Sequence, residues 1–307
     1  MKKILLIGNT CVDVIINIDH LPKTAEDIQP TSQTLALGGC PFNVSNIVRQ
    51  SGVPFLFITP VGTGIYGDFV RRELTRLGFP IPVRSEAENG CCYCLVEAGG
   101  ERTFLSYHGV EYTFSQEWMK DIDINEISMI YICGFEIEEP TGVEIISWLE
   151  NHPGPEIFFA PGPRLLMIDS EKKDRLFRLH PILHINEQEA YDLSGSSDLN
   201  EAAEILRSQT GNTVLITLGE RGSCCLEKDA AHLLFAEGIP TPVTDTIGAG
   251  DSHIGQILAS RAKGRSWIDA LRDANCVSSR VVSVQGASLT DEQYRQCLSV
   301  ASDLSNV

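Results

Sequence analysis

The chain has 307 residues, 43% of them hydrophobic, which is enough to form one large core or two smaller ones. Its formal net charge is −17 and its lysines and arginines are scattered, so the acidic surface excludes nucleic acid as an expected partner, because it repels phosphate backbones. No run of 18 apolar residues is present, so we expect no membrane-spanning helix.

The first residues resemble a signal peptide at first sight. The stretch "MKKILLIGNTCVDVIINID" begins with a lysine pair and continues with an apolar run. That run is interrupted by Gly8, Asn9 and Thr10 and ends at Asp13, and no small-residue cleavage site follows it. We therefore expect a buried first strand and a cytoplasmic protein.

Short β-branched or aromatic runs dominate the N-terminal part, and each is bounded by glycine, proline or charge, as strands are. These runs cover residues 3–8, 12–18, 55–62, 91–98 and 102–108. The two helical patterns between them cover residues 43–52 and 67–78. This part has more strands than a strand–helix alternation needs, so the extra strands are expected to form a small sheet beside a larger one.

The second half alternates regularly between strands and helices. The predicted strands cover residues 128–134, 156–162, 181–186 and 213–219, and a hairpin covers 224–229 and 231–237. The predicted helices cover residues 142–152, 187–195, 199–211, 250–264 and 266–286. This alternation predicts an α/β fold with a doubly wound, mostly parallel sheet and helices on both faces. Because we find no repeat or long linker, we expect one domain over residues 1–307.

Ten cysteines are present, and in a long cytoplasmic chain we expect them to be reduced and buried as small apolar residues. The run "CCYC" at residues 91–94 lacks the CxxC spacing of zinc sites, and no other cysteine or histidine cluster completes it. Strand alternation would place Cys92 and Cys94 on one face. We therefore expect no metal there.

The segment "DTIGAGD" at residues 245–251 leads into the helical pattern that follows it. A helix N-terminus offers unpaired N–H groups and positive charge, and glycines let its backbone approach an anion closely. Asp251 would then be a base beside an anion site, the pair that phosphoryl transfer needs. An aspartate N-cap after a glycine turn explains this segment equally well when it is taken alone.

Two further segments follow predicted strands at the sheet edge where open α/β sheets bind ligands. "TLGERGS" at 217–223 offers backbone to a phosphate or nucleotide, although a tight turn also explains its glycines. "NEQEA" at 186–190 carries Glu187 and Glu189, which could bind hydrated Mg²⁺, although helix capping explains them as well. GxxxxGK[ST] and a GxGxxG after the first strand are both missing, which argues against a Walker-type ATPase and a nicotinamide dehydrogenase.

These residues resemble the PfkB family of carbohydrate and nucleoside kinases, also called the ribokinase family. "DTIGAGD" is similar to the family's C-terminal signature, and "GGCPFNVS" at 38–45 is similar to its N-terminal GGxxxN signature. "GERTF", "NEQEA" and "TLGERG" fall in the family's order, and the resemblance covers roughly residues 3 to 300. It implies a ribokinase-like fold with a small β lid inserted at roughly 11–36 and 91–112.

The resemblance implies roles for the residues around the glycine loop. Asp251 is the general base that takes the proton from the substrate hydroxyl, and the N–H groups of Gly248, Ala249 and Gly250 form the anion hole for the γ-phosphate of ATP. Some members hold a monovalent cation, K⁺, beside this loop. The positions implied for that cation are Asp245, Ile247, Val282 and Gly286.

The nucleotide and its Mg²⁺ are also assigned by resemblance. Asn186 and Glu189 match the N-x-x-E motif, in which Glu189 places Mg²⁺ through water. Thr217, Gly219 and Gly222 match contacts to the nucleotide phosphates and ribose, and Asn275 lies where the adenine is bordered.

On the substrate side, Asp13 matches a carboxylate that binds sugar hydroxyls. A carboxylate suits this role because it can accept hydrogen bonds from two hydroxyl groups at once. A strand-end turn carboxylate is the alternative for Asp13. The other implied substrate contacts are Gly38, Gly39, Asn43, Asn9 and Glu136. Closure of the lid would exclude water from the site, and because lid sheets often pair between subunits, the resemblance also implies a homodimer.

The chain departs from the family pattern in several places. Ala160 stands where many sugar kinases have aspartate, which leaves Arg164 as the only charge of that turn. His253 follows the base by two residues, and we expect a helix-side histidine rather than a substrate contact. Gln256 replaces a residue that is usually small. His108 and Glu111, near the lid hinge, are candidates for further substrate contacts.

The substrate class follows from charge. Kinases that take sugar phosphates usually use basic residues to neutralise the substrate, and the loop with Cys40, Pro41 and Phe42 has no lysine. We therefore predict an ATP-dependent kinase of a small neutral sugar. A nucleoside kinase stays open because Phe42 could stack on a base. A sugar-phosphate kinase, a non-catalytic sugar-binding regulator and a hydroxyl dehydrogenase are less favoured alternatives.

Overall fold

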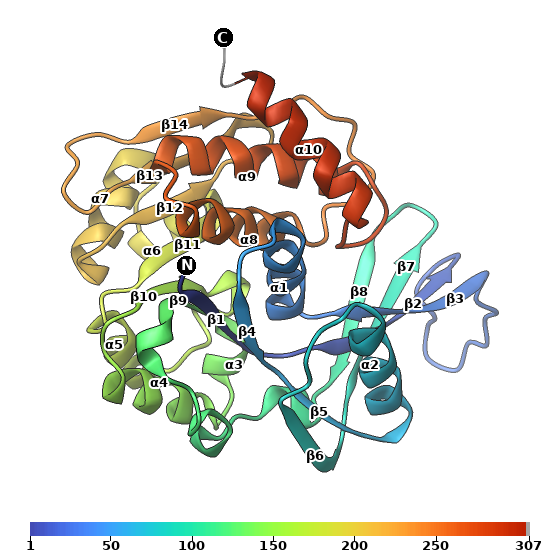
Figure 1. Ribbon diagram of the computed structural model, residues 1–307. Helices are drawn as coiled ribbons and strands as arrows, with labels where there is room; N and C mark the ends of the chain where they lie inside the picture. Colours follow the sequence, from blue (N-terminus) through green and yellow to red (C-terminus); the bar gives the residue numbers. More distant parts are fainter. Residues whose placement is uncertain (305–307) are drawn as a thin grey trace.

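A large twisted sheet separates two layers of helices, and a smaller sheet projects from one side of it (Figure 1). The structure is a computed structural model that describes residues 1–304, with side chains described up to residue 297. The expected doubly wound architecture is confirmed. No helix within the described residues is long and apolar enough to cross a membrane.

The large sheet has eight strands, of which the six at one side run parallel and the two at the other edge form an antiparallel hairpin. In spatial order the strands are β14 (Leu234–Glu237), β13 (Gly222–Leu226), β12 (Val214–Thr217), β11 (Ile182–Asn186), β10 (Glu156–Ala160), β9 (Ile127–Cys133), β1 (Lys3–Ile7) and β4 (Phe55–Ile58). Ile4 and Leu6 of β1 pack into one helical layer, and Leu5 and Ile7 pack into the other. This two-sided burial explains the uninterrupted apolar runs in the sequence.

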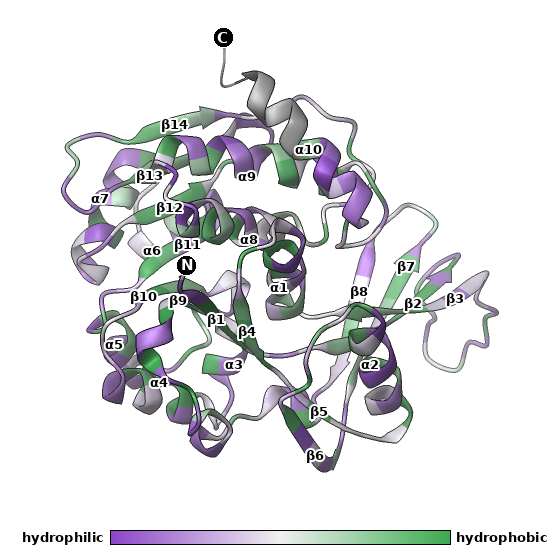
Figure 2. Cartoon of the chain, viewed as in Figure 1, coloured by the Kyte–Doolittle hydropathy of each residue, from purple (hydrophilic) through white to green (hydrophobic). Residues whose placement is uncertain are grey.

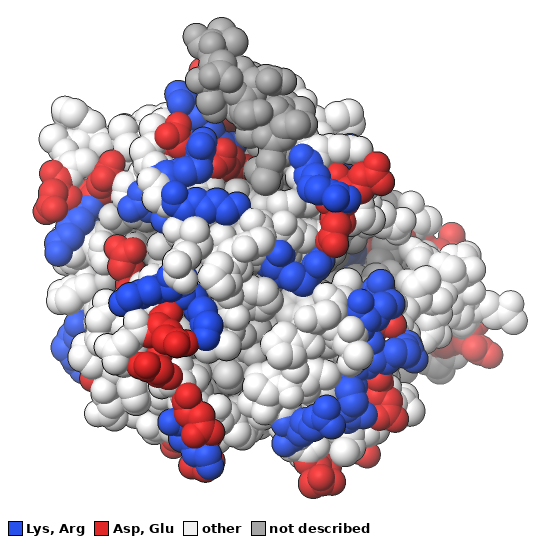
Figure 3. Space-filling model, in the orientation of Figure 1, with Lys and Arg blue, Asp and Glu red and all other residues white. Residues whose placement is uncertain are grey.

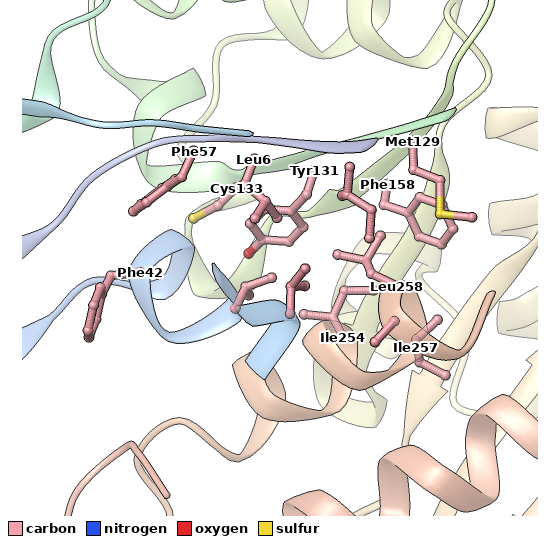
Figure 4. Packing of buried hydrophobic residues seen from close by; sticks show 14 of the residues in the cluster. Leu6, Phe42, Phe57, Met129, Tyr131, Cys133, Phe158, Ile254, Ile257 and Leu258 are labelled. Atoms are coloured by element: carbon pink, nitrogen blue, oxygen red, sulfur yellow. The ribbon is translucent and has the colours of Figure 1, made fainter. Parts of the chain in front are cut away.

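One helical layer carries the helix that follows the glycine loop. The helices on this side are α1 (Cys40–Ser51), α8 (Ala249–Ala262), α9 (Trp267–Val282) and α10 (Asp291–Leu304). Helix α8 packs against both α1 and α9, so every residue from Ser252 to Ser260 is buried. Figure 4 shows Ile254, Ile257 and Leu258 of α8 beneath the aromatic residues of the sheet. The start of α8 is therefore held in place by core packing.

The other layer is formed by shorter helices whose outer faces are polar. They are α3 (Gly134–Glu138), α4 (Gly142–Asn151), α5 (Ser170–Phe177), α6 (Glu187–Ser194) and α7 (Leu199–Thr210). Short 3₁₀ helices occur at Val110–Tyr112, Gln116–Met119, Ile124–Glu126, Gly162–Arg164 and Gly219–Arg221. Figure 2 shows the central strands as mainly hydrophobic, while hydrophilic residues concentrate on the outer helices. The longer helices α4 and α7 thus bury an apolar stripe against the sheet, while α5 buries only Leu176.

The smaller sheet contains the N-terminal strands expected to form a small sheet beside the larger one. Its spatial order is β3 (Ser32–Gly38), β2 (Cys11–Ile18), β7 (Cys91–Glu97) and β8 (Arg102–Tyr107). Helix α2 (Gly64–Arg76) and a parallel pair of strands, β5 (Pro60–Thr63) and β6 (Val83–Glu88), lie beside it. The expected run 55–62 is thereby split between β4 in the large sheet and β5 in this pair.

The surface carries both signs of charge in close mixture. Figure 3 shows acidic and basic side chains interspersed on the visible face, with a concentration of basic residues over α2. Several of these charges pair within the chain, as Arg71 does with Asp68 and Arg76 with Glu73. On this face the acidic residues are therefore spread among basic ones, as a solubility role predicts.

Candidate active site

The glycine loop turns directly into α8, and two of its glycines have different structural reasons to be glycine. Gly248 caps the helix with φ 74°, and a Cβ on it would lie 2.7 Å from the Cβ of Ala287. A Cβ on Gly250 would meet nothing within 4 Å. Position 248 thus requires glycine because of its positive φ and because Ala287 lies close to it. Glycine at position 250 instead leaves space open in front of the helix N-terminus.

The N–H groups of the loop are not equivalent. Ala249 donates a long hydrogen bond of 3.3 Å to the carbonyl of Thr246, so its N–H is partly used within the turn. Among the described residues, none accepts a hydrogen bond from the N–H of Gly248 or of Gly250. The expected anion hole therefore has free donors at Gly248 and Gly250, at the positive end of the α8 dipole.

Asp251 lies in the first turn of α8 beside this opening. Asn43 of α1 donates its Nδ2 to Asp251 Oδ2 at 2.8 Å. Burial raises the pKa of Asp251 to about 6, against the opposing hydrogen bonds from Asn43 and the Cys40 thiol. A carboxylate with a pKa near 6 is ionised at neutral pH and is still able to accept a proton, as a general base must be.

Two cavities meet at this loop. The smaller, about 260 Å³, is lined by Asp251 together with Cys40, Tyr131, Cys133, Asn186, Glu189 and Gly248. The larger, about 550 Å³, is lined by Gly219, Gly222, Val243, Ala249, His253, Asn275, Ser279 and Val282. Thr217 and Gly250 line both cavities. The larger is of the size that binds small-molecule ligands, and it reaches the base through the glycine loop.

The residues expected at the nucleotide gather in the larger cavity. Thr217, Gly219, Gly222 and Asn275 all line it. The amide of Asn275 is already used, since Oδ1 accepts from the Ser223 hydroxyl and Nδ2 donates to two backbone carbonyls of β14. Asn275 can therefore border a ligand as part of the cavity wall, while its amide fixes the wall in place.

Asn186 and Glu189 form a capping box at the start of α6. Asn186 Oδ1 accepts from the N–H of Glu189, and Glu189 Oε2 accepts from the N–H of Asn186, at 2.8 and 2.9 Å. Both residues also line the smaller cavity. Burial raises the pKa of Glu189. One carboxylate oxygen stays available at a fixed position, so this pair fits a hydrated Mg²⁺, and capping and metal binding are compatible here.

The residues expected at the substrate meet where β2, β3 and α1 converge. A Cβ on Gly38 would lie 2.1 Å from Asp13 Oδ2, and a Cβ on Gly39 would lie 2.3 Å from Asn9 Oδ1. The two glycines therefore leave the space that these two polar side chains occupy. Burial raises the pKa of Asp13 to about 6, and the Cys11 thiol partly offsets this by hydrogen bonding.

Three buried acceptor atoms in this region have no hydrogen-bond partner within the described chain: Asn9 Oδ1, Asn43 Oδ1 and Glu136 Oε2. Glu136 is held through its other oxygen, which accepts from the N–H of Asn9 at 2.8 Å. Burial raises the pKa of Glu136 to about 7. Buried acceptors without donors are costly, so this cluster suits a ligand that brings hydroxyl donors.

Asp245 does not fit the expected monovalent cation site. Its Oδ1 accepts from Arg102 Nη1 at 2.8 Å and from the N–H of Ile247 at 2.9 Å, and its Oδ2 accepts from the N–H of Gly286 at 3.0 Å. The carbonyl of Val282 already accepts from the N–H groups of Thr244 and Asp245. The carboxylate is paired with a guanidinium and the Val282 carbonyl already accepts two hydrogen bonds, so these two groups do not fit a bound K⁺ in this arrangement.

Glu111 is not a substrate contact, contrary to the expectation. It is fully buried, and its carboxylate accepts from the N–H groups of Gly90 and Gly109 and from Asn89 Nδ2. It therefore ties the start of β7 to the end of β8 inside the protein. His108 lies at the same end of β8, where it pairs with Glu139 and stacks on Tyr112.

The other departures from the pattern are also engaged within the chain. His253 is buried, and its Nδ1 hydrogen-bonds to His184 Nε2 at 3.0 Å beneath the glycine loop. Burial lowers the pKa of both histidines, so the pair is neutral at pH 7. Gln256 hydrogen-bonds within the core, and Arg164 pairs with Glu138 while its guanidinium lies over Phe135.

Comparison with known proteins gives one consistent family. The family model described as pfkB family carbohydrate kinase matches residues 1–293. An uncharacterized sugar kinase, YegV, of Escherichia coli is 30% identical over 290 residues, which cover 93% of this chain and 90% of that protein. Mouse ketohexokinase is 26% identical, with 93% of this chain and 97% of that protein covered.

The fold is similar to that of a solved ribokinase. Arabidopsis thaliana ribokinase, solved in complex with ribose and ATP, superposes with a TM-score of 0.80 at 18% identity and covers 97% of this chain and 98% of that one.

Proposed function

Because the chain belongs to the pfkB family of carbohydrate kinases, we propose that it transfers the γ-phosphoryl group of ATP to a hydroxyl of a small neutral sugar, with Asp251 as the general base. The observation that carries this proposal is the position of Asp251 beside the open space over Gly250, where the two cavities meet. This arrangement supplies the base and anion site that in-line transfer requires.

In the proposed reaction, Asp251 accepts the proton of the attacking hydroxyl. Asn43 donates to Asp251 Oδ2 and so fixes the direction of the carboxylate. The amide oxygen of Asn43, Oδ1, has no partner among the described residues, so the same side chain is suited to accept a hydrogen bond from a substrate hydroxyl. Asn43 therefore couples the orientation of the sugar to that of the base.

The transferred phosphoryl group would lie over Gly250, where the free N–H and the positive end of α8 stabilise developing charge. Glu189, oriented by its capping box with Asn186, would hold Mg²⁺ through water. The metal ion supplies charge neutralisation on the phosphates when it is bound. We propose that the nucleotide occupies the larger cavity, with its phosphates directed toward the loop.

The proposal of a neutral sugar rests on the polarity of the substrate region. Its available groups are the acceptors of Asn9, Asp13, Asn43 and Glu136, and none of these carries positive charge at any pH. A phosphate on the substrate would meet carboxylates and would be repelled. A nucleoside kinase remains the second candidate, although Phe42 packs against Phe79 in the core and so does not support base stacking.

An ATP-consumption screen with Mg²⁺ tests this function directly. It would cover neutral ketoses and aldoses, nucleosides and sugar phosphates. We expect turnover with a neutral sugar. Turnover only with a sugar phosphate would contradict the charge argument, and sugar binding without turnover would favour a non-catalytic regulator.

The pH dependence should identify both carboxylates. Each must be ionised, Asp13 to accept hydrogen bonds from the sugar hydroxyls and Asp251 to take the proton of the attacking hydroxyl. Burial raises the pKa of each carboxyl group to about 6. Activity is therefore complete above this pKa and is lost as pH falls through it. We expect log kcat/KM for the sugar to fall with a limiting slope of about two below pH 6, since two protonations abolish activity.

The matched variant for this profile is Asp13→Asn. It should retain a reduced kcat/KM with a limiting slope of about one, because Asp251 is then the remaining carboxylate that the proposed reaction requires to be ionised. A slope unchanged from that of the unmodified protein would show that Asp13 does not titrate in the reaction.

We further propose that the small sheet acts as a lid and that its outer face pairs with a second copy of the chain. Strand register places Leu35, Tyr93 and Leu105 on one face, opposite to Asp13, and they are 44%, 36% and 58% exposed.

We expect Leu105→Lys to convert a dimer to a monomer in sedimentation velocity. Phe104→Lys, which alters the opposite face of the same strand, should leave the dimer intact.

A further inference from the structure

An ion pair joins the smaller sheet to the loop that precedes α8. Arg102, at the start of β8, donates from Nη1 to Asp245 Oδ1 at 2.8 Å. The Asp245 side chain is 4% exposed and that of Arg102 is 24% exposed. This contact connects residues that lie 143 positions apart in the sequence.

The register of the smaller sheet determines which way Arg102 faces. Asp13 pairs with Cys92, and Arg102 pairs with Val96 four residues farther along the same strand. Since side chains alternate along a strand, Arg102 lies on the same face of the sheet as Asp13. One face of the sheet therefore presents the expected sugar-binding carboxylate and the guanidinium that reaches the glycine loop.

Asp245 organises that loop. Its carboxylate accepts hydrogen bonds from the N–H of Ile247, just before the glycines, and from the N–H of Gly286, which lies far beyond them in the sequence. Asp245 therefore ties the loop to the segment that contains Ala287, the residue close to Gly248. Burial acts to raise the pKa of Asp245, but these hydrogen bonds and Arg102 outweigh it and hold the pKa below its usual value. A buried carboxylate of this kind needs a counter-charge.

We propose that Arg102 is a positioning residue that supplies this counter-charge from the lid, in place of a bound monovalent cation. The inference rests on the proposed kinase function. It has two consequences. Phosphoryl transfer by this protein needs no K⁺, and the glycine loop reaches its working position only when the hairpin of β7 and β8 lies against it.

The first test compares the unmodified protein in KCl and in tetramethylammonium chloride at equal ionic strength. We expect kcat to agree within about twofold between the two salts, because the counter-charge is part of the chain. A strict requirement for K⁺ would overturn the proposal.

The second test replaces Arg102. Arg102→Ala should lower kcat by about tenfold or more, since the loop that receives the phosphate loses its fixed position, while KM for the sugar changes little. Arg102→Lys should recover much of kcat because it restores the charge. Arg76→Ala, which removes an exposed arginine with a single acidic partner on α2, serves as the matched control and should leave kcat unchanged. Equal losses in the alanine and lysine variants would overturn the role of charge.

The third test does not depend on activity. A double-mutant cycle on thermal unfolding would compare Arg102→Ala in the unmodified chain and in Asp245→Asn. We expect Arg102→Ala to lower Tm clearly in the first background and much less in the second. Additive effects would overturn the ion pair as the source of the counter-charge. If no sugar is phosphorylated, the proposed function fails, whereas this cycle still decides the role of Arg102.

Discussion

Replacing Asp251 by asparagine is expected to lower kcat by about three orders of magnitude, in the middle of the range for loss of a general base. The amide has the same shape and can still accept the hydrogen bond that Asn43 donates to Oδ2, so the surrounding packing is kept. What it lacks is the ability to take a proton from the attacking hydroxyl. The measurement is steady-state kinetics together with calorimetric titration of the sugar.

The two measurements separate the role of the base from that of a binding group. Sugar affinity in Asp251→Asn should stay within a few-fold of the unmodified protein, because Asp13, Asn9 and Asn43 remain in place. As a control, Asp273→Asn removes another partly buried carboxylate, which hydrogen-bonds to Ser260 in the middle of the α8–α9 contact, and it should affect stability rather than chemistry. Turnover near the normal rate in Asp251→Asn would exclude this residue as the base.

Gly250→Ala is expected to lower kcat/KM for ATP by about a hundredfold, with no loss of thermal stability. The added methyl group would meet no protein atom within 4 Å and Gly250 has no positive φ, so the fold accommodates it. Alanine is also the better helix former at this position. The methyl group would, however, occupy the space in which we propose that the phosphate lies.

The matched control is Gly99→Ala. Gly99 likewise has open space around its Cβ position and no positive φ, but it lies in the turn between β7 and β8. That variant should retain kcat/KM and Tm. Gly248→Ala makes the opposite comparison, because its φ of 74° and its contact with Ala287 predict a lower Tm. If Gly250→Ala retained full activity, the phosphate would have to lie elsewhere.

The sequence was sufficient to predict the large sheet because its strands are nearly continuous apolar runs, as two-sided burial requires. The expected strands and helices of the second half are confirmed, including the hairpin at its edge. Helices α3, α5 and α10 were missed. In α5 only Leu176 and Phe177 are apolar, which is too few for a periodic pattern in the sequence, although Asp169 as its N-cap was a usable signal.

The candidate site residues could be named from the sequence because short motifs determine local backbone structure, as the glycines of the loop do. Long-range pairing had no such signal. Glu111 and Arg102 are both charged residues in or near strands of the smaller sheet, yet one is buried under backbone donors and the other binds Asp245. Which carboxylate receives which donor depends on tertiary packing, so the potassium expectation and the role of Glu111 needed the structure.

The contact between Gly248 and Ala287 has a consequence for the order in which the protein is made. A chain emerges from the ribosome N-terminus first, so Asn9, Asp13 and Asn43 are available long before the glycine loop. When Asp251 has just been added to the chain, Gly286 and Ala287, which lie against that loop, have still to be synthesised. Under the proposed function, the residues proposed to bind the sugar are therefore made early, whereas the loop proposed to receive the phosphate can be held in place only near the end of translation.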